Sequence, residues 1–322
     1  MKSKVDRKVK KISKIILVTA VAVALLGVLT GCFNAINYTY QNANKYTAGD
    51  RTITDKIDTI DIDYMSGDID LKCDTTDTVT IKETTNKSVD EKMKVHSWVD
   101  GTTLYIRFCA SSKGLDFNDI EKKLELTLPA DVTLSDLIIN VSSGDVTAKG
   151  FTANSVETSS SSGGVALDCT SKDIKMEASS GGLSLSQHGD SDNISLVASS
   201  GSIKADVENA DMMDITVSSG DVDFSGTKVK DFEFVASSGE GKFTFAEAPE
   251  NSEFTASSGD IDIYVPEKSD LTVISEHSSG DFDYDLSFEK NGDKYVCGSG
   301  TNKMSVTTSS GDAKIKKLKT GE

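Results

Sequence analysis

Acidic residues recur at one position of a repeated turn, and this pattern could place oxygen ligands for Ca²⁺ in a row. The residue after the turn glycine is Asp or Glu in seven of the ten copies. Ca²⁺ prefers oxygen ligands, so Asp221, Asp260 and Asp281 are the candidates for a structural calcium role. Calcium-binding β-rolls use a Gly-Gly-x-Gly-x-Asp nonapeptide, which is not present here. We therefore favour solvated turn carboxylates, with no metal and no other cofactor.

No group of residues has the spacing that a catalytic site needs. The serines lie in repeated turns rather than in a nucleophile elbow with a positioned base. Cleavage of an acidic polysaccharide requires clustered basic side chains, but Arg51 and Arg107 are the only arginines after Arg7. The histidines are scattered and lack a metal-binding spacing such as HExxH: His96, His188 and His277. The sequence therefore predicts a protein that is not an enzyme.

Four cysteines follow the N-terminal segment without any CxxC or His-Cys grouping: Cys73, Cys109, Cys169 and Cys297. A zinc site is unsupported by this spacing. Disulfides form readily in exported proteins, but the intervals specify no pairing. We expect buried free thiols, because cysteine is among the residues most often buried.

The repeat itself must position these residues. The turn reads Ser-Ser-Gly in most copies, and between Gly144 and Gly280 it returns every 18 to 21 residues. A fixed period near 20 is typical of a solenoid, and apolar residues alternate with polar ones on both sides of each turn, which indicates strands. Glycine suits a turn that needs positive φ. The repeat-turn glycines, to which we assign a structural role, are Gly144, Gly163, Gly181, Gly201, Gly220, Gly239, Gly259 and Gly280.

The pattern predicts an all-β, single-domain parallel β-solenoid with rungs of about 20 residues, preceded by a signal or anchor helix. We divide the chain into a signal peptide or membrane anchor (1–31), a linker (32–54), a first rung with a β-hairpin cap (55–136) and the repeat solenoid (137–319). The cap hairpin turns at Asp100-Gly101. Lysines near the C-terminus are interpreted as protection of an exposed edge strand, with salt bridges as the alternative. Aromatic residues of the later rungs are expected in the core rather than on a binding face.

The N-terminus carries a targeting signal. Seven basic residues precede an apolar run from Ile15 to Thr30, the arrangement of a secretory signal. Leu29-Thr30-Gly31-Cys32 resembles the lipobox of bacterial lipoproteins, which implies that Cys32 receives the lipid. The alternative is an uncleaved transmembrane helix over residues 15–33, which is just long enough to span a bilayer. Either reading places the body on the extracytoplasmic face of the cell membrane.

The remainder of the chain is strongly acidic. Without residues 1–31 it has 27 basic and 50 acidic residues, a net charge of −23. Such a body repels nucleic acid, so we expect no nucleic-acid partner.

Several segments together resemble the bacterial putative-adhesin family, a group of unknown function. The resemblance covers residues 55–318 and depends on the turn series and on these motifs: Ser66-Gly67-Asp68, Leu126-Thr127-Leu128-Pro129, Tyr264-Val265-Pro266 and Thr307-Thr308-Ser309-Ser310-Gly311-Asp312. It implies a β-solenoid displayed at the cell envelope, without catalytic residues that could be transferred. We expect an adhesin-like or scaffold protein that binds a protein or cell-wall polymer. The alternative is an envelope-stress sensor that contacts a membrane signalling protein.

Overall fold

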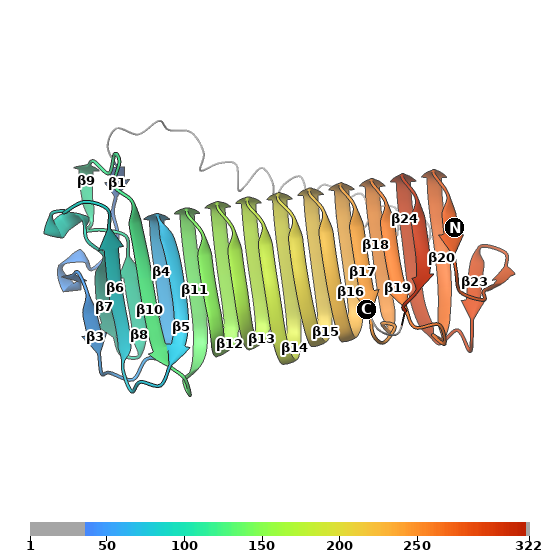
Figure 1. The fold of residues 1–322 in the computed structure, drawn as a ribbon, viewed down its shortest axis with the longest axis horizontal. Coiled ribbons are helices and arrows are strands. Elements are labelled where there is room, and N and C mark those ends of the chain that lie inside the picture. The colour runs from blue at the N-terminus through green and yellow to red at the C-terminus, as the bar shows by residue number, and fades with distance from the viewer. Residues whose placement is uncertain (1–35, 320–322) are drawn as a thin grey trace.

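The computed structural model describes residues 36–319, and they form one long β-solenoid (Figure 1). The predicted signal segment and Cys32 lie outside the described residues. Apart from two short 3₁₀ helices, η1 (Ala43–Lys45) and η2 (Glu91–Met93), all regular elements are strands. They are β1 (Ile36–Tyr38), β2 (Thr47–Ala48), β3 (Arg51–Ile53), β4 (Thr59–Ser66), β5 (Asp68–Asp74), β6 (Val79–Thr85), β7 (His96–Asp100), β8 (Thr103–Arg107), β9 (Ser112–Leu115), β10 (Lys122–Pro129), β11 (Thr133–Ser143), β12 (Val146–Ser162), β13 (Val165–Ser180), β14 (Leu183–Ser200), β15 (Ile203–Ser219), β16 (Val222–Ser238), β17 (Gly241–Phe245), β18 (Asn251–Ser258), β19 (Ile261–Val265), β20 (Leu271–Ser279), β21 (Phe282–Tyr284), β22 (Glu289–Asn291), β23 (Lys294–Cys297), β24 (Asn302–Ser310) and β25 (Ala313–Lys317).

Each of the central strands β12 to β16 makes most of one rung, and consecutive rungs pair in parallel. The chain runs up one half of the rung to the Ser-Gly turn and returns along the other half. Val146 pairs with Val165, and Val165 with Leu183, so equivalent residues lie side by side. The repeat period read from the sequence is therefore the stacking register of the strands.

The core consists of columns of alternate side chains that point into the rung. Ile215 and Val217 precede one turn and are buried, as are Val222 and Phe224 after it. Most aromatic residues of the later rungs occupy the same inward columns, which confirms them as core: Phe224, Phe234, Phe243, Phe245 and Phe254. Tyr264 is an exception, because it alternates with the buried Ile263 and Val265 and is only half-buried. Tyr284, at the end of the stack, is 39% exposed.

The turn glycines stack so closely that no side chain fits between rungs. A Cβ atom on Gly201 would lie well inside van der Waals contact of the carbonyl oxygen of Gly181. The same relationship links each turn glycine to its neighbour along the stack. Gly201 does not have positive φ, whereas the other seven repeat-turn glycines do. Space between backbones, rather than positive φ, is therefore the requirement that all of these positions share.

The N-terminal end shows that part of the linker prediction was wrong. Residues 36–53 belong to the folded cap, because β1 pairs with β9, β2 with β7 and β3 with β6. Tyr38 and Ile53 are buried, and the Tyr38 hydroxyl donates to the Asp63 carbonyl at 2.8 Å. These strands are two or three residues long, too short to show a period in the sequence. The predicted hairpin is present as the antiparallel pair β7–β8.

The first rung of the sequence is not the first rung in space. Strands β4 and β5 lie between β8 and β10 on one side and β11 and β12 on the other. Figure 1 shows this as a blue rung inserted among green ones. The chain makes one rung, leaves it to build the cap, and then stacks its next rung on the opposite side.

The C-terminal end repeats this arrangement. Strands β24 and β25 lie between β18 and β19 on one side and β20 and β21 on the other (Figure 1). The edge-strand interpretation of the C-terminal lysines is therefore wrong, since β25 has a neighbour on both sides. Lys316 and Lys317 instead form salt bridges of 2.7 Å with Asp262 and Glu267.

Candidate binding site

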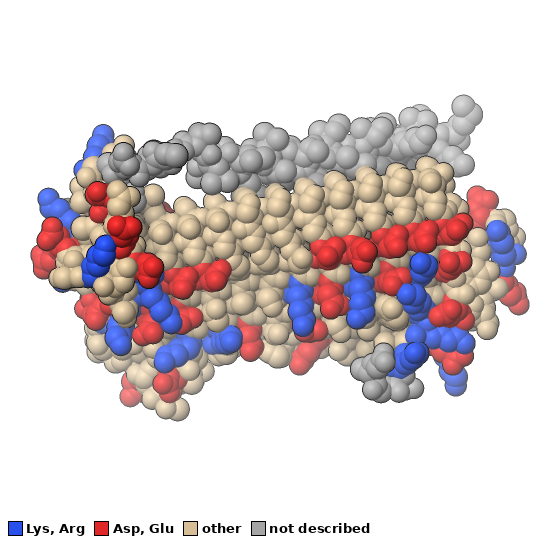
Figure 2. All heavy atoms as spheres, turned by 45° about the horizontal axis from the view of Figure 1, so that its top comes forward, with Lys and Arg blue, Asp and Glu red and all other residues tan. Residues whose placement is uncertain are grey.

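The acidic residues of the turns form a ladder with the backbone of the neighbouring rung. The carboxylate of Asp145 accepts a hydrogen bond from the Gly164 amide at 2.7 Å, and that of Asp221 accepts one from the Glu240 amide at 2.9 Å. The row of acidic residues along the turns is interrupted in mid-solenoid (Figure 2), where Gly164, Gly182 and Ser202 stand in the sequence. Backbone amides of the neighbouring rung thus donate hydrogen bonds to these stacked carboxylates.

The calcium candidates do not gather into a metal site. Asp221, Asp260 and Asp281 lie on separate rungs, and Asp260 accepts a hydrogen bond from the Asp312 amide at 2.8 Å. Between residues 36 and 319, no group of three or more His, Cys, Asp and Glu side chains is placed to hold a metal ion. The Asp281 amide donates to Asp312, and this bond helps to hold the pKa of Asp312 below its ordinary value.

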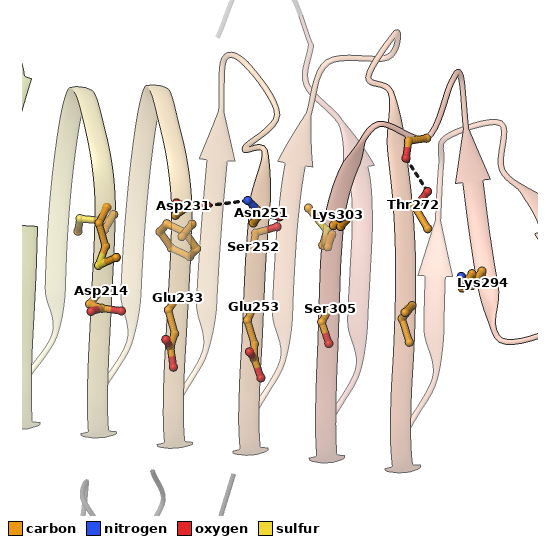
Figure 3. Close-up of a pocket in the computed structure, with 16 residues that line it drawn as sticks. Asp214, Asp231, Glu233, Asn251, Ser252, Glu253, Thr272, Lys294, Lys303 and Ser305 are labelled. Atoms are coloured by element: carbon orange, nitrogen blue, oxygen red, sulfur yellow. Dashed lines mark hydrogen bonds between the residues drawn. The ribbon is translucent and has the colours of Figure 1, made fainter. Parts of the chain in front are cut away.

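A groove of about 510 Å³ runs along the outer face of the half-rungs that precede the turns. Figure 3 shows Asp214, Glu233 and Glu253 in one row, on the consecutive strands β15, β16 and β18, and Ser305 of β24 continues the row. Neighbouring strands are about 4.8 Å apart, so the row repeats at that spacing. Each of these residues lies six positions before its turn glycine. That constant offset is the signal by which the sequence could have revealed the row.

The second row of the groove is mixed in character. Met212 is 46% exposed, and the Asn251 side chain donates to the Asp231 carboxylate at 2.7 Å. Lys303 and Lys294 lie toward the C-terminal end. The groove is therefore acidic over β15 to β18 and basic beyond them, with an exposed thioether at its start. Such a surface can bind an extended ligand that carries regularly spaced positive or hydroxyl groups.

The half-rungs after the turns carry an alternating column of charges. Register aligns Lys204 with Asp223, Asp223 with Lys242, Lys242 with Asp262 and Asp262 with Lys314. Figure 2 shows blue and red side chains alternating on this face, below the acidic row. Opposite charges on neighbouring strands attract, so this column stabilises the stack locally.

The cap contains the most deeply buried ion pair, between Lys122 and Glu83. Their side chains are 1% and 4% exposed, and the ammonium lies 2.8 Å from the carboxylate. Glu83 also accepts from the Tyr64 hydroxyl at 2.8 Å and the Val95 amide at 2.9 Å, while Lys122 donates to the Met93 carbonyl at 2.7 Å. Burial lowers the pKa of Lys122, and Glu83 opposes that shift. Because its polar atoms are occupied by protein partners, the pair closes the core rather than forming a reactive site.

The remaining residues singled out in the sequence stay apart. His188 contacts Asp168 at 2.9 Å and Glu208 at 3.5 Å on the surface, and these carboxylates raise the pKa of the imidazole. His96 is in the cap and His277 is on β20, so the three histidines form no common site. The four cysteines are free thiols, as expected. Cys109, Cys169 and Cys297 are buried and Cys73 is half-buried.

Comparison with known proteins agrees with this architecture. Residues 57–316 match the family described as Toastrack DUF4097. No protein of curated function matches the chain. A solved structure of a putative adhesin from Parabacteroides merdae is similar over 88% of this chain and all of its own, with 12% identity and a TM-score of 0.50.

Two structures from Parabacteroides distasonis are also similar. One is a putative adhesin with 13% identity and a TM-score of 0.48, covering 85% of this chain and 97% of its own. The other is a putative lipid binding protein with 18% identity and a TM-score of 0.37, at the same coverage. At these identities the likeness concerns the fold alone. Within residues 36–319, no helix is long and apolar enough to cross a bilayer.

Proposed function

The chain belongs to the Toastrack DUF4097 family, and on that premise we propose that it is a non-enzymatic, membrane-tethered protein of the bacterial cell envelope with an adhesin-like or scaffold role. It binds its partner through the outer face of the solenoid. The observation that carries this proposal is the groove across β15 to β24, with carboxylates at a constant register on successive rungs. A stacked array offers such a surface without a catalytic constellation.

The partner that fits this groove is extended and carries positive or hydroxyl groups at intervals. A cell-wall polymer with free amines and a lysine-rich surface protein both have this chemistry. The four carboxylates of the groove, from Asp214, Asp231, Glu233 and Glu253, outnumber its two lysines. Attraction between such charges speeds encounter and is weakened by salt.

A photo-reactive amino acid in place of Met212 tests this function in living cells. Because Met212 is exposed within the groove, we expect it to capture wall polymer or a surface protein. The matched control replaces Asp206, an exposed residue on the other half of the same rung. Capture that is equal at the two positions, or absent at Met212, contradicts binding in the groove.

A charge test complements the capture. Neutralising Asp214, Glu233 and Glu253 together, to Asn, Gln and Gln, is expected to reduce the captured partner strongly. The control neutralises three exposed carboxylates outside the groove, Asp77, Asp206 and Asp293. Its net charge therefore equals that of the groove variant. Equal effects of the two triple variants indicate a response to overall charge, which argues against a specific groove.

The membrane tether is proposed at Cys32. Only three residues lie between it and Ile36, where the described fold begins, and the four residue steps from Cys32 to Ile36 reach at most roughly 14 Å when extended. A lipid on Cys32 therefore keeps the cap close to the bilayer. Metabolic labelling with an alkyne fatty acid tests this, since Cys32→Ser removes the label if Cys32 is lipidated. A chain that stays in the membrane without label has the transmembrane helix instead.

The short tether favours one alternative function, an envelope-stress sensor that contacts a membrane signalling protein. In that case the cap, rather than the groove, faces the partner. A photo-reactive residue at the exposed cap position Lys113 then captures a polytopic membrane protein. If only the groove position captures a partner, the scaffold role is favoured.

A further inference from the structure

Most rungs of the solenoid make the same two backbone hydrogen bonds to the next rung. At the turn, the Gly163 amide donates to the Ser180 carbonyl at 3.1 Å. Two residues later, the Val165 amide donates to the Gly182 carbonyl at 3.0 Å. Where the residue after the glycine is acidic, its carboxylate can also accept an amide from the next rung, as Asp145 does from Gly164. The amides of the turn glycine and of the second residue after it, together with the turn carboxylates, thus point in one direction along the stack.

The last rung in that direction is the one formed by β20 and β21. The Ala313 amide of the preceding rung donates to the Asp281 carbonyl at 2.9 Å, which completes the ladder up to this point. Among residues 36–319, the amides of Gly280 and Phe282 have no carbonyl partner in a following rung, and the Asp281 carboxylate accepts no amide. The final rung therefore presents two donors and one acceptor at the positions that bond successive rungs elsewhere in the stack.

The C-terminal hairpin, formed by the antiparallel strands β22 and β23, covers only part of this edge. Strand β23 pairs with Leu271–Ile274, the first four residues of β20, and no other strand within residues 36–319 pairs with 275–279 on that side. Among the strands that the structure describes, β21 pairs with β25 alone. The Phe282 and Tyr284 rings pack against Tyr295 of the hairpin, with ring centroids 5.0 and 5.4 Å apart, but Tyr284 remains 39% exposed.

We propose that this edge is a docking site for one further β-strand, supplied by an extended basic segment of a partner protein. The charge pattern identifies the partner. The alternating column of Lys204, Asp223, Lys242, Asp262 and Lys314 continues to Asp283 at the edge, so its next member is a cation. Lys314 itself pairs with Asp312 at 3.4 Å. Glu276 and Asp281 make the rest of the open edge acidic.

A second copy of the chain fits this edge poorly. Pairing of two such edges would bring Glu276, Asp281 and Asp283 of both copies together, and like charges on neighbouring strands repel. The opposite end of the solenoid offers no complement, because the antiparallel strands β2 and β7 and β3 and β6 close it. Unpaired edges are normally protected, and strand addition at an open edge is a common mode of peptide binding.

The proposal concerns the end of the solenoid and holds whether or not the lateral groove binds its own partner. The probe is a labelled peptide with the sequence of residues 307–317, which contains three lysines and already forms the strand that pairs with β20 and β21 from the inner side. Binding to the full-length chain, purified in detergent, is measured by fluorescence anisotropy at low and high salt. We expect saturable binding that weakens with salt.

Two substitutions test the position of the peptide. Asp283→Lys is expected to weaken binding by about tenfold or more, because it replaces the attraction with repulsion. Phe282→Pro removes an outward donor and blocks strand addition, so binding should be lost. The matched control is Glu289→Lys, an exposed charge reversal on the neighbouring hairpin strand β22, which should change affinity by less than about twofold. Melting temperatures show whether each variant is folded.

The remaining outcomes overturn the proposal in distinguishable ways. A peptide with its lysines replaced by glutamate should not bind, and equal binding contradicts a basic partner. Loss of binding in the Asp214, Glu233 and Glu253 variant, but not in Asp283→Lys, assigns the peptide to the groove. Concentration-dependent dimers that Phe282→Pro abolishes identify a second copy as the occupant. Absence of any peptide binding by a folded chain also refutes the proposal.

Discussion

The carboxylate of Asp312 accepts a hydrogen bond from the amide of Asp281, 31 residues earlier in the sequence, at 3.0 Å. Asp312 is in turn bonded to Asp260, through its own amide, at 2.8 Å. The β24–β25 rung thus lies between two rungs, β18–β19 and β20–β21, that precede it in the sequence. The β4–β5 rung is also enclosed at the other end, but there the rungs on both sides follow it in the sequence. Both outer rungs therefore depend on an enclosed rung for their attachment to the stack.

Removal of β24 and β25 tests this dependence at the C-terminal end. Truncation after Gly300 takes away the rung that joins β20 and β21 to β18 and β19. We expect residues 271–284 to lose hydrogen-exchange protection, while β12 to β15 keep theirs. Replacing the β22–β23 hairpin with a Gly-Ser linker is the control and should preserve most of the protection. If the truncated chain still protects β20, that strand can stack directly on β18, contrary to the expectation.

Gly201→Ala tests whether close backbone approach explains the glycine column. The added Cβ meets the Gly181 carbonyl oxygen, and because Gly201 does not have positive φ, dihedral strain does not contribute. We expect the free energy of unfolding to fall by about 3 kcal/mol. Gly164→Ala is the control, since its Cβ would lie 3.5 Å from the nearest atom, in ordinary contact. Chemical denaturation measures both, and equal losses would contradict the explanation.

Lys122→Met tests the buried ion pair of the cap. The substitution leaves the Glu83 carboxylate buried without its cation, and such a loss costs about 3–5 kcal/mol of unfolding free energy. Adding Glu83→Gln should recover part of this loss, because the neutral amide removes the unpaired charge. Urea denaturation of the two single variants and the double variant measures the coupling. Additive losses would show that the two side chains act independently.

His188 is expected to give a pH-dependent contribution to stability. Asp168 and Glu208 raise the pKa of the imidazole in the folded chain. The contribution is therefore fully present below the unfolded pKa, about 6.5, and is lost as pH rises through the higher folded pKa. NMR titration should show the pKa of His188 falling in Asp168→Asn but not in Asp173→Asn, a change on the same strand. An unchanged pKa in Asp168→Asn contradicts the assignment of the cause.

The repeat and its core were predictable because their signals are local. Each turn repeats Ser, Gly and alternating apolar residues, and parallel pairing in register converts that spacing directly into rungs. The order of the end rungs was not predictable, because local signals do not distinguish one rung from another. Every rung carries the same motif, so nothing local to Gly280 or Gly311 states which of them stacks on Gly259.

The cap and the groove depend on contacts across long sequence distances. Residues 36–53 are polar and aperiodic, and they become strands only because partners such as Leu115, Ile81 and Ser97 lie beside them. The acidic row of the groove was present in the sequence as a constant offset from the turn glycine. It became a candidate site only when the structure placed those positions on the outer face.

The enclosed C-terminal rung also has a consequence for biosynthesis. As the chain is made from its N-terminus, successive rungs can join the growing stack up to β19 as soon as they are complete. The next segment, β20 and β21, has no place until β24 and β25 follow it. During synthesis, β20 and β21 therefore stay unpaired with the stack until residues 302–317 have been made. Insertion of β24 and β25 then joins β20 and β21 to β18 and β19. Attachment of the β20–β21 rung therefore requires synthesis through residue 317.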